Sequence, residues 1–177
     1  MSYLLGLSGS LRRTSTNTKL MRVASRIYDP TEFMEGDLDL PLYNGDVEEN
    51  GIPEKVQTLS DQVSGAEAVI ISCPEYNKAL SGVMKNALDW VSRTKGNPWR
   101  DKPVAIMSAT AGRAGGERSQ SSLRLCLNPF RPVVLPGPEV LIAGSGDAFD
   151  ENDELVNEAS VRMLTDLMDQ LRAMARR

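Results

Sequence analysis

The chain has 177 residues, 41% of them hydrophobic and 25% charged, and its formal net charge at pH 7 is −4. That length suits one domain, residues 1–177, and the negative charge provides no basic surface for a nucleic acid. The absence of histidine and the presence of only two cysteines make a metal site and histidine-based acid–base catalysis unexpected. No apolar run approaches the roughly 20 residues that span a membrane, and no signal peptide is evident, so we expect a cytoplasmic protein with no membrane partner.

The first predicted unit is a strand, a polar turn and a helix. Residues 2–8 form an apolar run, and residues 16–28 carry apolar side chains at helical spacing. Between them the turn reads SGSLRRTSTNT, from Ser8 to Thr18, and is rich in hydroxyl and guanidinium groups. A helix entered in this way points free backbone N–H groups and its positive dipole end at the turn, which favours a bound phosphate. The alternative is an ordinary capping turn, which needs only one such residue.

The same turn excludes several familiar phosphate sites. It lacks the Gly-x-x-x-x-Gly-Lys loop of many nucleotide hydrolases and the Gly-x-Gly-x-x-Gly turn of dinucleotide-binding folds. It also contains no cysteine that could act as a phosphatase nucleophile. The sequence therefore predicts a phosphate that is held rather than cleaved.

Apolar runs and helical patterns alternate through the rest of the chain. We predict further strands at 32–35, 66–73, 103–109 and 132–135, the last with a possible extension through 140–142, and helices at 53–64, 82–93, 116–127 and 153–175. This alternation indicates an α/β fold with a doubly wound five-stranded parallel sheet. Residues 38–51 are read as an acidic surface loop. Ligands of such sheets lie outside the carboxyl ends of the strands, which directs attention to the loops there.

Two further loops are candidates for that edge. Pro74 to Asn77 combines a rigid turn, a carboxylate, an aromatic ring and an amide, a set that can bind a flat heterocycle, although Pro and Asn are also common turn formers. In the helix that follows, Trp90 is expected in the core and Lys85 is spaced to pair with Asp89.

The loop after the fourth strand, residues 108–116, is small and glycine-rich, so that a ligand can approach its backbone closely. The alternative is a plain strand-to-helix turn. Arg113 is its one long cation, and it would meet either a phosphate of a second nucleotide or solvent.

Together these loops resemble the NADPH-dependent FMN reductase family, flavodoxin-like enzymes that include quinone-, azo-dye- and chromate-reducing members. The resemblance is strongest in three segments and departs from many relatives at Ala79 and Ser81, where Ser and Pro are usual. The residues that carry it are Gly9, Ser10, Leu11, Arg12, Ser15, Asn17 and Leu20; Pro74, Glu75, Tyr76, Asn77, Gly82, Lys85, Asn86, Asp89 and Trp90; and Ser108, Gly112, Gly115 and Gly116.

The resemblance implies a set of site residues, a cofactor and a reaction. FMN would be the cofactor, NADPH or NADH the co-substrate, and a quinone, free flavin, azo compound or metal oxyanion the small-molecule electron acceptor. No protein residue would act as catalyst, because hydride transfers at the flavin. The phosphate would be held by Ser10, Arg12, Ser15, Thr16 and Asn17, one part of the isoalloxazine by Pro74, Glu75, Tyr76 and Asn77, and its other edge by Ser108, Thr110 and Gly112.

The resemblance also implies an oligomer, a homodimer or homotetramer. The alternative function is a flavodoxin-like electron carrier without substrate turnover. It is less favoured because the chain is only mildly acidic and offers a single aromatic, Tyr76, in the predicted ligand loops.

Overall fold

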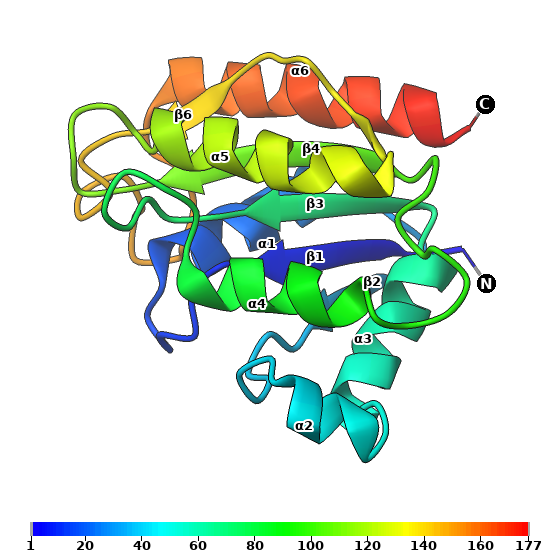
Figure 1. The fold of residues 1–177 in the computed structure, drawn as a ribbon. Helices are drawn as coiled ribbons and strands as arrows, with labels where there is room; N and C mark the ends of the chain where they lie inside the picture. The colour runs from blue at the N-terminus through cyan, green and yellow to red at the C-terminus, as the bar shows by residue number, and fades with distance from the viewer. Residues whose placement is uncertain (1, 177) are drawn as a thin grey trace.

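A computed structural model describes residues 2–176, and in it a parallel sheet carries helices on both faces (Figure 1). The strands follow the order β2-β1-β3-β4-β5, and β6 also pairs with β4. This order is that of the flavodoxin-like doubly wound sheet, and it confirms the predicted fold class. The elements are β1 (Leu4–Ser8), α1 (Thr16–Tyr28), β2 (Phe33–Gly36), α2 (Gly45–Glu49), α3 (Glu54–Gly65), β3 (Ala68–Ser72), α4 (Gly82–Val91), β4 (Pro103–Ala109), α5 (Glu117–Leu127), η1 (Asn128–Phe130), β5 (Val133–Val134), β6 (Val140–Ile142) and α6 (Glu158–Ala175).

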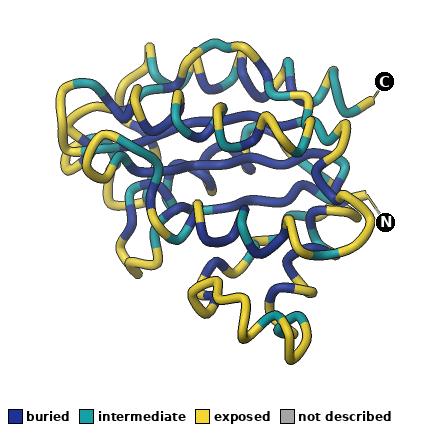
Figure 2. The backbone as a smooth tube through the Cα atoms, viewed as in Figure 1, coloured by how far each residue is buried: buried dark blue, intermediate teal, exposed yellow. Residues whose placement is uncertain are grey.

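The central strands supply two hydrophobic cores, one on each face of the sheet. Successive side chains of a strand point to opposite faces, so Leu4 and Ile70 pack with α1 and α6, whereas Leu5 and Ile71 pack with α3, α4 and α5. Strands buried on both faces carry continuous apolar runs, as AVIIS in β3 does. Figure 2 shows these strands as buried, while the loops at their carboxyl ends, on the left, are largely exposed.

The helix α4 bears out two expectations about its side chains. Trp90 is completely buried. Lys85 pairs with Asp89 at 2.6 Å, and both side chains remain partly exposed, so the pair contributes only some tenths of a kcal/mol.

The predicted fifth strand is divided in two. β5 pairs with the beginning of β4, and β6 pairs with its end. The residues between them include Pro136 and Pro138, which have no N–H to donate to a ladder, so the strand is interrupted there.

The last helix begins five residues later than the predicted start at Asp153. Asn157 caps α6 by accepting a hydrogen bond from the Ser160 N–H at 3.0 Å. Before it, the Asp150 carboxylate accepts the N–H groups of Asn152 and Glu154, each at 2.9 Å. These hydrogen bonds close a turn where the first helical turn was predicted. Side chains such as Ser and Asp generally compete with helix formation in this way, because they bond to nearby backbone groups.

The segment 38–51 is more than an acidic surface loop, and that expectation is corrected in part. Leu38 and Leu40 are buried in the core that α3 and α4 share, and residues 45–49 form α2. The carbonyl of Pro41 accepts hydrogen bonds from the Asn86 amide at 3.0 Å and from the Trp90 indole N–H at 2.7 Å. The segment is therefore fastened to α4, and its acidic residues face outward from that anchor.

Candidate functional site

A cleft of about 600 Å³ lies at the carboxyl ends of the parallel strands. These strand ends are on the left in Figure 1. It is bounded by the loops that follow β1, β3, β4 and β6, and its volume is in the range of small-molecule and cofactor sites. Two predicted site residues, Asn77 and Ser108, do not line it. The predicted residues that do line it are Ser10, Arg12, Ser15, Thr16, Asn17, Pro74, Glu75, Tyr76, Thr110 and Gly112.

The turn after β1 has the donors that a phosphate needs. Ser15 caps α1, because its hydroxyl oxygen accepts the N–H groups of Asn17 and Thr18 at 3.2 and 3.3 Å. Within residues 2–176, the N–H groups of Arg13 and Thr16 find no acceptor in the chain. Free N–H groups at the positive end of a 13-residue helix, beside hydroxyl and guanidinium groups, match the chemistry of a phosphate monoester.

The Arg12 side chain is hydrogen-bonded within this turn. Its Nε donates to the Thr14 hydroxyl at 3.0 Å, which leaves the terminal guanidinium nitrogens available to a ligand. Lys19, which sequence reasoning did not select, also lines the cleft and forms an ion pair with Asp153. Because Asp153 neutralises Lys19, the positive charge at this part of the cleft comes from Arg12, which forms no ion pair among the described residues.

Asn17 lines the cleft, but the hydrogen bonds of its side chain are made inside the protein. The side chain amide donates to the Ala109 carbonyl at 2.8 Å and accepts from the Ala109 N–H and the Ser72 hydroxyl, each at 3.0 Å. The residue is 3% exposed. Asn17 thus joins the first turn of α1 to the ends of β3 and β4, and it supports the turn from behind.

The loop after β3 is held in place at both of its ends. Glu75 accepts the backbone N–H of Arg118 at 3.1 Å and lies 3.6 Å from its guanidinium, so the carboxylate caps α5. Tyr76 and Ala79 exchange two backbone hydrogen bonds that close a tight turn. Asn77 occupies this turn at φ 51°, and its side chain lies outside the cleft.

Tyr76 lines the cleft and is 53% exposed. At the other end of the loop, Ser81 is fully buried and caps α4 by accepting the Met84 N–H at 3.4 Å. Ser81, which departs from the pattern of many relatives, therefore stabilises the start of α4.

Ser108 lies behind the loop that follows β4. It is fully buried, its hydroxyl donates to the Gly115 carbonyl at 2.6 Å, and it accepts from the Gln120 amide at 2.9 Å. A Cβ on Gly116, whose φ is +95°, would lie 2.7 Å from the Ser108 side chain. Ser108 thus shapes the glycine-rich loop, and Thr110 and Gly112 form the wall of the cleft.

The loop after β6 completes the cleft and was not predicted. Ser145 donates its N–H to the Thr110 carbonyl at 3.0 Å and accepts from the Thr16 hydroxyl at 3.3 Å. Ser145 and Gly146 both line the site. The sequence signal for these two residues is that they follow a strand. That strand is hard to recognise from the sequence, because Pro136 and Pro138 come just before it.

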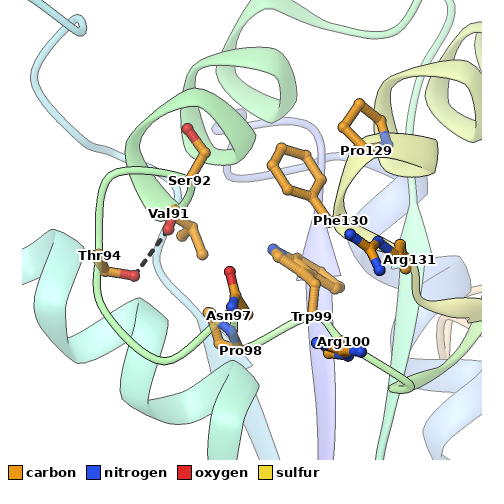
Figure 3. Close-up of a pocket in the computed structure, with 10 residues that line it drawn as sticks. All are labelled: Val91, Ser92, Thr94, Asn97, Pro98, Trp99, Arg100, Pro129, Phe130 and Arg131. Carbon is orange, nitrogen blue, oxygen red and sulfur yellow. Dashed lines mark hydrogen bonds between the residues drawn. The ribbon is translucent and has the colours of Figure 1, made fainter.

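A smaller pocket of about 100 Å³ lies at the opposite end of the sheet (Figure 3). It is enclosed by the end of α4, the loop that carries Trp99 and the η1 turn with Phe130, and it contains none of the predicted site residues. The Trp99 indole N–H is buried and has no partner among the described residues. Its volume suits a few water molecules rather than a nucleotide.

Comparisons with known proteins agree with this geometry. The family model for NADPH-dependent FMN reductase matches residues 3–147. The chain is 37% identical over 176 residues to an NAD(P)H-dependent FMN reductase of Pseudomonas aeruginosa, an alignment covering 98% of this chain and 95% of that one. It is 35% identical to a 2-hydroxy-1,4-benzoquinone reductase of a Burkholderia species, covering 95% and 93%.

A solved structure shows the same fold. It is the flavoenzyme NAD(P)H:(acceptor) oxidoreductase of Paracoccus denitrificans, which matches with a TM-score of 0.89 and 30% identity over 99% of this chain and 98% of that one. The predicted family, cofactor and enzyme class are confirmed. The chain belongs to the NADPH-dependent FMN reductase family of flavodoxin-like NAD(P)H oxidoreductases.

Proposed function

We propose that the protein binds one FMN in the cleft and passes two electrons from NAD(P)H to a quinone. One observation carries the proposal: a phosphate-binding turn and the loops suited to a flat ring line the same cleft. The hydroxyls and the guanidinium of the turn after β1 line it, and so do the proline, tyrosine and glycine-rich segments that can border a ring.

The FMN phosphate would be held by Ser10, Arg12, Ser15 and Thr16 together with the free N–H groups of the turn. Pro74, Glu75 and Tyr76 would border one part of the isoalloxazine, and Thr110 and Gly112 its other edge. Asn17 and Ser108 would act indirectly, since their side chains form hydrogen bonds inside the protein. Asn77 would also act indirectly, through the turn that it occupies next to Tyr76.

Bound FMN would supply the redox chemistry, by accepting hydride from NAD(P)H and passing two electrons to the acceptor. The residues of the cleft need only bind, orient and expose one face of the ring. A chain without histidine is compatible with this mechanism, because the hydride step needs no acid or base from the protein.

Quinones are the acceptor that we propose first, because one relative is named for reduction of a benzoquinone. Free flavin, azo compounds and metal oxyanions would meet the same exposed ring. We also propose that residues 1–177 form one domain, since both cores pack on a single sheet, and that the protein is a cytoplasmic homodimer or homotetramer. Among the described helices, none is long and apolar enough to cross a membrane.

The experiment is a set of kinetic measurements on the FMN-loaded protein. We expect about one flavin per chain by absorbance, bleaching of that flavin on stopped-flow mixing with NADPH alone, and parallel double-reciprocal lines with a quinone. Parallel lines follow because a single open face admits NAD(P)H and acceptor in turn.

The relatives reported above are named as reductases, which favours turnover over the carrier alternative. Bleaching that requires a separate reductase, or the release of mainly one-electron products, would support the carrier instead. Preference for FAD, or no flavin uptake, would refute the cofactor assignment.

A further inference from the structure

A second cleft, of about 430 Å³, adjoins the first along its wall. The two share Glu75, Thr110 and Gly112, and the second continues over Arg113 and the start of α5. A ligand in the first cleft can therefore extend into the second without leaving the surface of these loops.

The second cleft contains two guanidinium groups, and only one of them is neutralised. Arg118 pairs with Glu75 at 3.6 Å. Arg113 is exposed and, within residues 2–176, forms no ion pair and no side-chain hydrogen bond. The cleft thus retains one positive charge without a partner in this protomer.

The backbone beside Arg113 leaves room for a ligand. A Cβ added to Gly112 would meet only the Thr110 hydroxyl, at 3.9 Å, so the cleft is open at this position. Gly115 and Gly116 are instead packed against Leu141 and Ser108. Because the Glu75 carboxylate already caps the start of α5, Arg113 supplies the unpaired positive charge of this cleft. An extended anion can lie along this backbone with Arg113 at its side.

We propose that Arg113 binds a phosphate of the nicotinamide dinucleotide while the nicotinamide lies over the flavin in the adjoining cleft. This inference rests on the proposed function. The FMN phosphate would have its own donors in the turn after β1, none of which lines the second cleft, so a cation in the second cleft would serve a different phosphate. That phosphate is either the 2′-phosphate, which only NADPH carries, or the pyrophosphate, which NADPH and NADH share.

The test compares the variant Arg113→Ala with Arg100→Ala in the FMN-loaded protein. Arg100 is an exposed arginine at the opposite end of the sheet, so its removal makes the same change in net charge away from the cleft. Binding of 2′-phospho-ADP-ribose and of ADP-ribose, which share the pyrophosphate and differ only in the 2′-phosphate, is measured by titration calorimetry, which requires no turnover. Values of kcat/KM are measured for NADPH and NADH with an uncharged quinone and with an anionic one.

We expect Arg113→Ala to weaken nucleotide binding by about 10- to 100-fold, the usual effect of losing one charged hydrogen bond. A loss confined to 2′-phospho-ADP-ribose and NADPH identifies the 2′-phosphate, and a loss for both nucleotides and both co-substrates identifies the pyrophosphate. Affinities and kcat/KM values equal to those of Arg100→Ala would overturn the proposal.

The same experiment separates this inference from the proposed function. Oxidation of NADPH by the unmodified protein tests the function, whereas the difference in nucleotide affinity between the two variants tests Arg113. A change in kcat/KM for an anionic acceptor alone, with both nucleotide affinities unchanged, would also overturn the assignment.

Discussion

Replacing Asn17 by alanine should destabilise the whole domain, although the residue lies in the predicted phosphate turn. Its amide makes three hydrogen bonds, two with the backbone of Ala109 and one with the Ser72 hydroxyl. The side chain is 3% exposed, so water does not replace these partners in the folded protein without rearrangement.

The magnitude follows from the groups left behind. Each buried polar group that loses its partner costs about 1–3 kcal/mol. With three such groups, taking the lower part of that range for each, the free energy of unfolding should fall by about 3–5 kcal/mol. A residue acting only as a phosphate ligand would leave the stability of the flavin-free protein almost unchanged.

The assay is urea unfolding without flavin, because bound FMN would add its own contribution to the free energy. Asn157→Ala is the matched control: that asparagine caps α6 with a single hydrogen bond to the Ser160 N–H, and its loss should cost about 1 kcal/mol. If Asn17→Ala costs no more than the control, the buried bonds do not stabilise the fold and the predicted role in phosphate binding returns.

Three other substitutions test separate parts of the structure. Arg12→Ala should weaken FMN binding by about 1.5–3 kcal/mol and leave riboflavin binding unchanged, since riboflavin has no phosphate; equal affinities for FMN before and after the change, by flavin fluorescence, would place the guanidinium in solvent. Gly116→Ala should lower the free energy of unfolding by about 1–3 kcal/mol because its φ is +95° and the new Cβ would lie 2.7 Å from the Ser108 side chain, whereas Gly112→Ala, with open space around it, should change it little; equal urea midpoints would contradict this. The pKa of the Asp150 carboxyl is lowered, mainly because the Glu154 backbone N–H donates to it, so its stabilisation is present above the ordinary pKa of about 3.9 and is lost as the pH falls through the lower folded value; the melting-temperature difference between wild type and Asp150→Asn should shrink as the pH falls from about 6 towards 3, and a constant difference would refute the assignment.

The sequence predicted the sheet and most helices because their apolar patterns are long and regular. The bounds of α1 and β4 agree with the predicted ranges. One failure lies where a short-range polar contact decides the conformation, because the Asn157 cap places the start of α6 five residues after the predicted start at 153. Another failure is at Leu38 and Leu40, which enter the core from a segment whose composition is otherwise that of a solvent-exposed loop.

Most of the predicted site residues line one cleft, and the structure shows which of their side chains are already hydrogen-bonded inside the protein. Polar residues at a strand end have two competing uses: they bind a ligand, or they satisfy buried backbone groups that would otherwise lack partners. Asn17 and Ser108 take the second use, whereas Ser15 caps its helix and still lines the cleft. Spacing along the chain does not separate these uses, because both put the residue in the same loop.

This division of roles predicts two distinct patterns of flavin binding. Arg12, which lines the cleft, would contact the phosphate alone in the proposed complex, so its loss should affect FMN and spare riboflavin. Asn17 instead fixes the distance between the turn after β1 and the loop after β4, since it holds Ala109, which itself lines the cleft. Its loss should therefore weaken both flavins, because the ring and the phosphate are bound by loops that it keeps in register. Titrations of both flavins at a temperature where Asn17→Ala remains folded distinguish the patterns, and an effect on FMN alone would show that Asn17 contacts the phosphate directly.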